Sequence, residues 1–102
     1  MNKDDRIDCL FIRHRILELL QVYKENLDKE AVDAVRGYIG VGENEMAYEG
    51  LFIELMGLQF CPTDIDIDMY MKIGKVLGLD KESVFHPGFW EWFTEYVNKH
   101  NK

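Results

Sequence analysis

The side chains whose types and spacing could do chemistry are carboxylates, and they gather in one part of this 102-residue chain. No Lys or Arg occurs between Arg36 and Lys72, a stretch that holds seven acidic residues: Glu43, Glu45, Glu49, Glu54, Asp64, Asp66 and Asp68. These seven charges equal the net charge of the whole chain, −7. Taken singly, each could be an ordinary solvated helix residue. Together they predict an acidic surface that attracts a basic protein surface.

The same charge disfavours two classes of partner. Nucleic acid and anionic membrane both present phosphate groups, which an acidic surface repels. We therefore expect neither nucleic acid nor membrane to bind, and we look for a protein partner.

Three of these aspartates have a spacing that could indicate a calcium site. Asp64, Asp66 and Asp68 have the one-three-five spacing of a calcium-binding loop. However, Met69 stands where such a loop needs glycine, and Lys75 stands where it needs a bidentate glutamate. We expect no metal site, and we interpret these aspartates as helix-start residues that favour the macrodipole of the next helix.

Catalysis has little support in the sequence. His14, His86 and His100 have no metal-ligand spacing, and His14 is interpreted as a packing residue. Glu45 and Glu49 could do acid-base work only in a desolvated cleft with a group that orients the substrate, which the sequence does not indicate. We therefore expect no enzyme and no cofactor.

The compartment is predicted from the two cysteines and from hydropathy. Cys9 and Cys61 are far apart in sequence and favour buried free thiols in a reducing compartment, with a disulfide as the alternative. Residues 1–8 lack the apolar core of a signal peptide, and no apolar run has membrane-spanning length. We expect a cytoplasmic protein.

The apolar residues recur with a helical period along the chain, which predicts an all-α fold in a single domain of residues 1–102. Gly40, Gly42 and Gly78 are predicted helix stops. Five helices are expected: Asp4–Tyr23, Asp28–Ile39, Glu43–Leu58, Asp68–Leu77, and a last helix that contains Phe89–Val97.

The N-terminal helix has apolar residues on two sides. One face carries Cys9, Ile12, Ile16, Leu19, Leu20 and Tyr23, and the second carries Ile7, Leu10, Phe11 and Leu17. A helix that is apolar on two sides packs on two sides. We therefore expect the N-terminal helix to lie at the centre of a bundle of about five helices.

Aromatic residues are the candidates for binding affinity, because a few desolvated aromatic side chains usually dominate an interface. The candidate anchors are Tyr48, Phe60, Tyr70, Trp90 and Trp92. Burial inside the protein would disqualify any of them. The aromatic stripe of the last helix is interpreted as core, with an exposed recognition face as the alternative.

Two blocks of the sequence resemble a known family. Gly42–Leu51, followed by Ile73–Asp80, is similar to the small acidic immunity proteins of bacterial polymorphic toxin systems, of the MafI type that also occurs beside contact-dependent growth inhibition toxins. The resemblance covers roughly residues Val32–Asp80. It implies a protein that binds and neutralises the C-terminal toxin domain of a delivered effector.

The charge pattern and the resemblance predict the same function. A nuclease toxin must be basic to hold phosphate, so an inhibitor gains by presenting carboxylates to its cleft. We expect an immunity protein that neutralises a basic toxin through the acidic surface, with a nuclease as the expected toxin. The alternative is an acidic helical adaptor or regulator that binds a basic cellular protein.

Overall fold

The structure is a computed structural model, and it describes residues 7–58, 62 and 65–100. Within these residues it contains α-helices and no strand, which confirms the predicted all-α class. The five α-helices are α1 (Cys9–Tyr23), α2 (Lys29–Gly40), α3 (Asn44–Met56), α4 (Ile67–Val76) and α5 (Phe89–His100), and a 3-10 turn, η2 (Lys24–Asn26), follows α1. Each helix lies within a predicted range or differs from it by a few residues at its ends.

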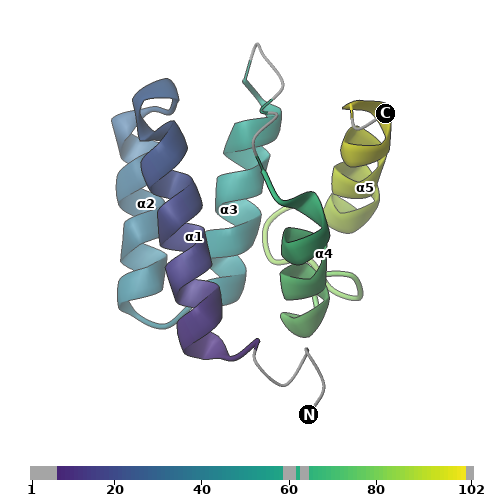
Figure 1. The fold of residues 1–102 in the computed structure, drawn as a ribbon, viewed down its shortest axis with the longest axis horizontal. Coiled ribbons are helices and arrows are strands. Elements are labelled where there is room, and N and C mark those ends of the chain that lie inside the picture. The colour runs from purple at the N-terminus through teal and green to yellow at the C-terminus, as the bar shows by residue number, and fades with distance from the viewer. Residues whose placement is uncertain (1–6, 59–61, 63–64, 101–102) are drawn as a thin grey trace.

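Helix α3 lies in the middle of the fold, with α1 and α2 on one side and α4 and α5 on the other (Figure 1). The prediction that the N-terminal helix is central was wrong. The first apolar face of α1 is buried except for Cys9, but on its second face Leu10 is 74% exposed, and Phe11 and Leu17 are half-buried. Helix α1 therefore packs through one main face, and the larger buried surface belongs to α3.

Aspartates begin two of the helices. The carboxylate of Asp8 accepts a hydrogen bond of 2.9 Å from the N–H of Phe11 at the start of α1. Asp66 does the same for the N–H of Met69 at the start of α4, at 3.3 Å, and Asp68 lies in the first turn of α4. These contacts satisfy free N–H groups of the helix ends. The helix-start role predicted for Asp66 and Asp68 is confirmed, and Asp64 lies outside the described residues.

Two glycines end helices as predicted. Gly42 follows α2 with φ of 78°, and Gly78 follows α4 with φ of 79°, a backbone region that side chains other than glycine rarely adopt. After α2, the N–H of Glu43 donates to the carbonyl of Tyr38, and the N–H of Gly42 donates to that of Ile39. After α4, the N–H of Leu79 donates to the carbonyl of Gly74, and the N–H of Gly78 donates to that of Lys75, so both helices end in Schellman motifs. They turn the chain sharply into the segments that line the groove described below.

An aromatic cluster joins α3 to α5. Tyr48 and Phe52 of α3 have ring centroids 4.7 Å apart, and Phe52 and Phe93 lie 4.9 Å apart. Phe89 stacks on Phe93 at 5.6 Å, and its ring meets Tyr48 edge-on. Offset and edge-on pairs of this kind add to the free energy of apolar burial. The core interpretation of the α5 stripe is confirmed for Phe89, Phe93 and Val97, which are buried.

Helix α4 meets α5 at Gly74. A Cβ atom added there would lie 2.4 Å from Cζ3 of Trp90 and 2.9 Å from the hydroxyl oxygen of Tyr48. The indole therefore lies against the backbone of α4, in space that any other residue at position 74 would occupy.

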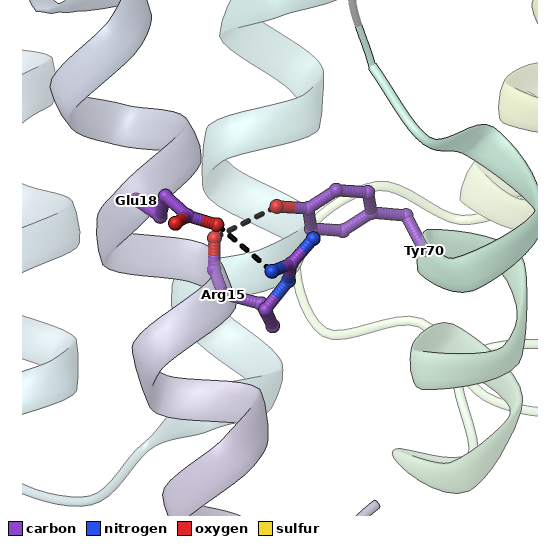
Figure 2. A network of polar contacts seen from close by, with 3 residues as sticks. All are labelled: Arg15, Glu18 and Tyr70. Atoms are coloured by element: carbon purple, nitrogen blue, oxygen red, sulfur yellow. Dashed lines mark hydrogen bonds and ion pairs between the residues drawn. The ribbon is translucent and has the colours of Figure 1, made fainter.

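Two tyrosine hydroxyls tie α4 to the helices beside it. The Tyr48 hydroxyl donates to the carbonyl of Tyr70 at 2.6 Å, and the Tyr70 hydroxyl donates to the carbonyl of Arg15 on α1 at 2.8 Å. The guanidinium of Arg15 also pairs with Glu18 at 3.0 Å, and Figure 2 shows it beside the Tyr70 ring. Burial raises the pKa of Tyr48 well above its ordinary value and raises the pKa of Tyr70 to about 12. Both hydroxyls therefore remain protonated donors at neutral pH.

Hydropathy gives one further result. None of the helices in the described part of the chain is long and apolar enough to cross a membrane.

Candidate protein-binding surface

A groove of about 420 Å³ lies between the start of α3 and the turn that follows α4. Glu43 and Glu45 line it from the α3 side, and Glu82 lines it from the turn. The Schellman turns at Gly42 and Gly78 bring these two segments of chain to the groove. All three glutamates are exposed, so they form an accessible acidic surface, called here the acidic groove.

The charge of the acidic groove is not neutralised by the protein. Lys81 is the cation among its lining residues, against three carboxylates. In the described part of the chain, no ion pair includes Glu43, Glu45 or Glu82, and the ion pair present joins Arg15 to Glu18. Like charges that outnumber the neighbouring cation repel one another and favour a basic partner.

The other predicted carboxylates lie elsewhere. Glu54 is exposed near the end of α3 and lines a different hollow, between α2, α3 and Phe85. Asp66 and Asp68 are exposed at the start of α4. The base-free stretch therefore places its exposed, described carboxylates at three positions on the fold rather than in one continuous patch.

Glu49 does not belong to the acidic surface. It was predicted to face the toxin beside Glu45, but its side chain is 0% exposed. Glu49 is buried because the loop of residues 83–88 covers the edge of α3 on which its side chain lies.

The buried carboxylate of Glu49 organises that loop. Oε1 accepts a hydrogen bond from the N–H of Val84 at 2.8 Å, and Oε2 accepts two, from the N–H groups of Phe85 at 2.7 Å and His86 at 2.8 Å. Three N–H dipoles directed at one carboxylate compensate for its removal from water. Glu49 is therefore a structural residue that fixes the backbone of residues 84–86.

The local sequence does not distinguish Glu49 from Glu45. Glu45 and Glu49 are one helical turn apart, and both lie at the edge of the apolar face of α3. Which of the two becomes buried depends on where the loop of residues 83–88 lies. No local pattern specifies that position.

The aromatic candidates divide by burial. Tyr48 is 0% exposed and Tyr70 is 3% exposed, so both are core residues and cannot anchor a partner. Trp90 is half-buried, whereas Trp92 is 37% exposed and its ring lies 4.7 Å from that of His86. Phe60 lies outside the described residues.

Two exposed residues, one in the acidic groove and one outside it, were not identified from the sequence. Glu82 completes the acidic groove although it lies beyond the base-free stretch, and Phe85 is an exposed aromatic residue in a loop. The organisation of both depends on contacts between distant segments, which the helical period does not show.

Cys9 and His14 are both exposed at the surface of the described part of the chain. Cys9 is a free thiol as predicted, but it is exposed rather than buried, and Cys61 lies outside the described residues. His14 is exposed, so its interpretation as a packing residue was wrong. Among the described residues, no three His, Cys, Asp or Glu side chains are grouped so as to hold a metal ion.

Comparison with known proteins found no similarity. No protein-family model matches the sequence, and no curated protein and no solved structure matches at a significant level.

Proposed function

We propose that this chain is an immunity protein that binds and neutralises a basic toxin domain, with a nuclease as the favoured target, in the bacterial cytoplasm. The protein acts by binding and not by catalysis. The observation that carries the proposal is the acidic groove, in which Glu43, Glu45 and Glu82 are exposed around one hollow with Lys81 as the lining cation. The resemblance of Gly42–Leu51 and Ile73–Asp80 to MafI-type proteins supports the same function.

The mechanism follows from electrostatics. A nuclease domain concentrates positive charge where it holds phosphate, so exposed carboxylates on a rigid helix end and turn complement that surface. Long-range attraction of this kind raises association rates by roughly 10- to 1,000-fold. An immunity protein benefits from such speed because it must bind the toxin before the toxin reaches nucleic acid.

Affinity has a different source in this proposal. Exposed charge pairs contribute little to the binding free energy. Aromatic side chains that become buried in the interface contribute most of it. Among the residues that the structure describes, Trp92 and Phe85 are exposed aromatic residues available for that role, whereas Tyr48 and Tyr70 are buried.

The test is a growth assay with the toxin domain encoded beside this gene. Cells that express the toxin domain should grow when this protein is present and stop when it is absent. A variant with Glu43, Glu45 and Glu82 replaced by glutamine should protect less well at equal protein level. If folded protein gives no protection, the immunity proposal is wrong and the alternative, an adaptor for a basic cellular protein, takes its place.

A further inference from the structure

A hollow of about 240 Å³ lies on a different part of the surface from the acidic groove. Helix α2 lines it with Ala31, Ala34 and Tyr38, α3 lines it with Gly50 and Glu54, and the loop after α4 adds Phe85. Val35 of α2 and Ile53 of α3 line it as well, so apart from Glu54 its walls are aliphatic or aromatic. It therefore combines an apolar interior with one carboxylate.

Two aromatic rings, those of Tyr38 and Phe85, lie beside Gly50 in this hollow. The centroids of Tyr38 and Phe85 are 5.7 Å apart, with 37° between the ring planes. A Cβ atom added at Gly50 would lie 3.8 Å from a ring carbon of each. A carbon atom placed beside Gly50 would thus be in ordinary van der Waals contact with both rings.

The charge of the hollow is uncompensated. Glu54 is exposed, and the described residues that line the hollow include no Lys, Arg or His. No ion pair within the described part of the chain includes Glu54. An occupant that matches these walls has an apolar stem, a flat surface for the rings and a positive charge for the carboxylate.

The loop that carries Phe85 is already fixed in position. The carboxylate of Glu49 accepts hydrogen bonds from the N–H groups of Val84, Phe85 and His86, so no ordering of this backbone is needed on binding. Preorganisation of this kind lowers the entropic cost of binding.

We infer that this hollow binds an arginine side chain of the basic partner. The inference deepens the proposed function and rests on the partner being basic. The methylene stem lies against Ala31 and Ala34, the guanidinium plane lies against the rings of Tyr38 and Phe85, and its positive charge faces Glu54. Arginine fits better than lysine because its planar, weakly hydrated head stacks on aromatic rings and remains charged.

Short peptides test the inference without any toxin. The probes are three capped tripeptides, acetyl-Gly-X-Gly-amide, in which X is arginine, citrulline or lysine. Citrulline keeps the shape of arginine but has no charge. Each is titrated into the full chain, and the amide NMR signals of Tyr38, Gly50 and Phe85 are followed. We expect these signals to shift with arginine, with binding about three- to tenfold tighter than for citrulline or lysine.

Matched variants assign the effect to the hollow. Glu54→Gln should remove the preference for arginine over citrulline, whereas Glu95→Gln, a change of an exposed carboxylate on α5, should keep it. Phe85→Leu keeps an apolar side chain and the backbone N–H, so it should weaken arginine binding by removing the ring face. Unchanged far-ultraviolet circular dichroism shows that each variant is folded.

Three results would overturn the inference: equal binding of arginine and citrulline, equal binding of arginine and lysine, or shifts confined to the acidic groove. Failure of the growth assay with successful arginine binding would instead reject the immunity function and leave the arginine site in place.

Discussion

The carboxylate of Glu49 on α3 accepts a hydrogen bond of 2.7 Å from the backbone N–H of Phe85, a residue 36 positions later in the chain. With the neighbouring bonds from Val84 and His86, this contact turns an acidic residue of the base-free stretch into an internal support. It holds the loop whose exposed ring lines the proposed arginine site. The acidic stretch thus contains a buried carboxylate that supports the fold as well as exposed carboxylates on the surface.

Glu49→Gln should destabilise the protein by about 2–4 kcal/mol, because an amide has one acceptor oxygen and cannot satisfy three N–H donors. Amide hydrogen exchange at Val84, Phe85 and His86 should accelerate more than elsewhere. Urea unfolding and hydrogen exchange measure the two effects. Glu45→Gln, one turn away and exposed, is the control and should stay within about 0.5 kcal/mol. Equal stability of the two variants would contradict the structural role of Glu49.

Gly74→Ala should destabilise the protein by about 1–3 kcal/mol, since the added Cβ would lie 2.4 Å from the Trp90 ring and force the indole to move. Tryptophan fluorescence should shift as Trp90 becomes more exposed. Gly37→Ala in α2 is the matched control, because no atom lies within 4 Å of its added Cβ. That control should stabilise the protein by up to about 1 kcal/mol through helix propensity. The prediction fails if both variants change the free energy of unfolding in the same direction.

Alkaline pH should weaken the fold through Tyr70. Burial raises the pKa of Tyr70 from 10.0 to about 12, so the folded state favours the neutral hydroxyl. The stabilisation is fully present below pH 10.0, the ordinary pKa, and is lost as pH rises toward about 12. Tyr70→Phe should flatten this pH dependence while lowering stability at neutral pH by about 0.5–1.5 kcal/mol, the value of one hydrogen bond.

Urea unfolding as a function of pH, together with the ultraviolet absorbance of tyrosinate, checks the role of Tyr70. Tyr38→Phe is the control, because Tyr38 is half-buried at the edge of the fold. A pH dependence that is unchanged in Tyr70→Phe would assign the alkaline loss to other groups.

Replacing Glu43, Glu45 and Glu82 by glutamine should slow association with the basic partner domain by at least about tenfold at low salt, because the steering field is lost. The dissociation rate should change less, and the difference from the unmodified protein should shrink as salt is raised. Stopped-flow kinetics across a salt series measures both rates. A triple variant of Glu18, Glu25 and Glu30, also to glutamine, matches the charge change outside the groove. Equal slowing by this control would show that net charge, and not the acidic groove, governs association.

The helices could be predicted from the sequence because their signals are local. Helical spacing of apolar residues, the aspartates at the start of α4, and the glycines after α2 and α4 each act within a few residues. The buried face of α5 followed in the same way from Phe89, Phe93 and Val97. Predictions failed where burial depends on distant segments.

Leu10 and Glu49 illustrate the two kinds of failure. Leu10 is apolar and lies on a regular helical face, yet no described element covers it, so it remains 74% exposed. Glu49 is charged, yet the loop of residues 83–88 covers it and supplies three donors. In both cases tertiary packing decides whether the side chain is buried, and the periodicity within one helix carries no information about that packing.

The hydrogen bonds of Glu49 also couple two segments of chain that are synthesised at different times. They join residues 35, 36 and 37 positions apart, so they close a longer loop than the neighbouring helix pairs α1–α2 and α2–α3 require. During synthesis Glu49 emerges before its three donors exist and remains hydrated until residues 84–86 arrive. Burial of this carboxylate therefore requires docking of residues 84–86, and the same contacts position Phe85.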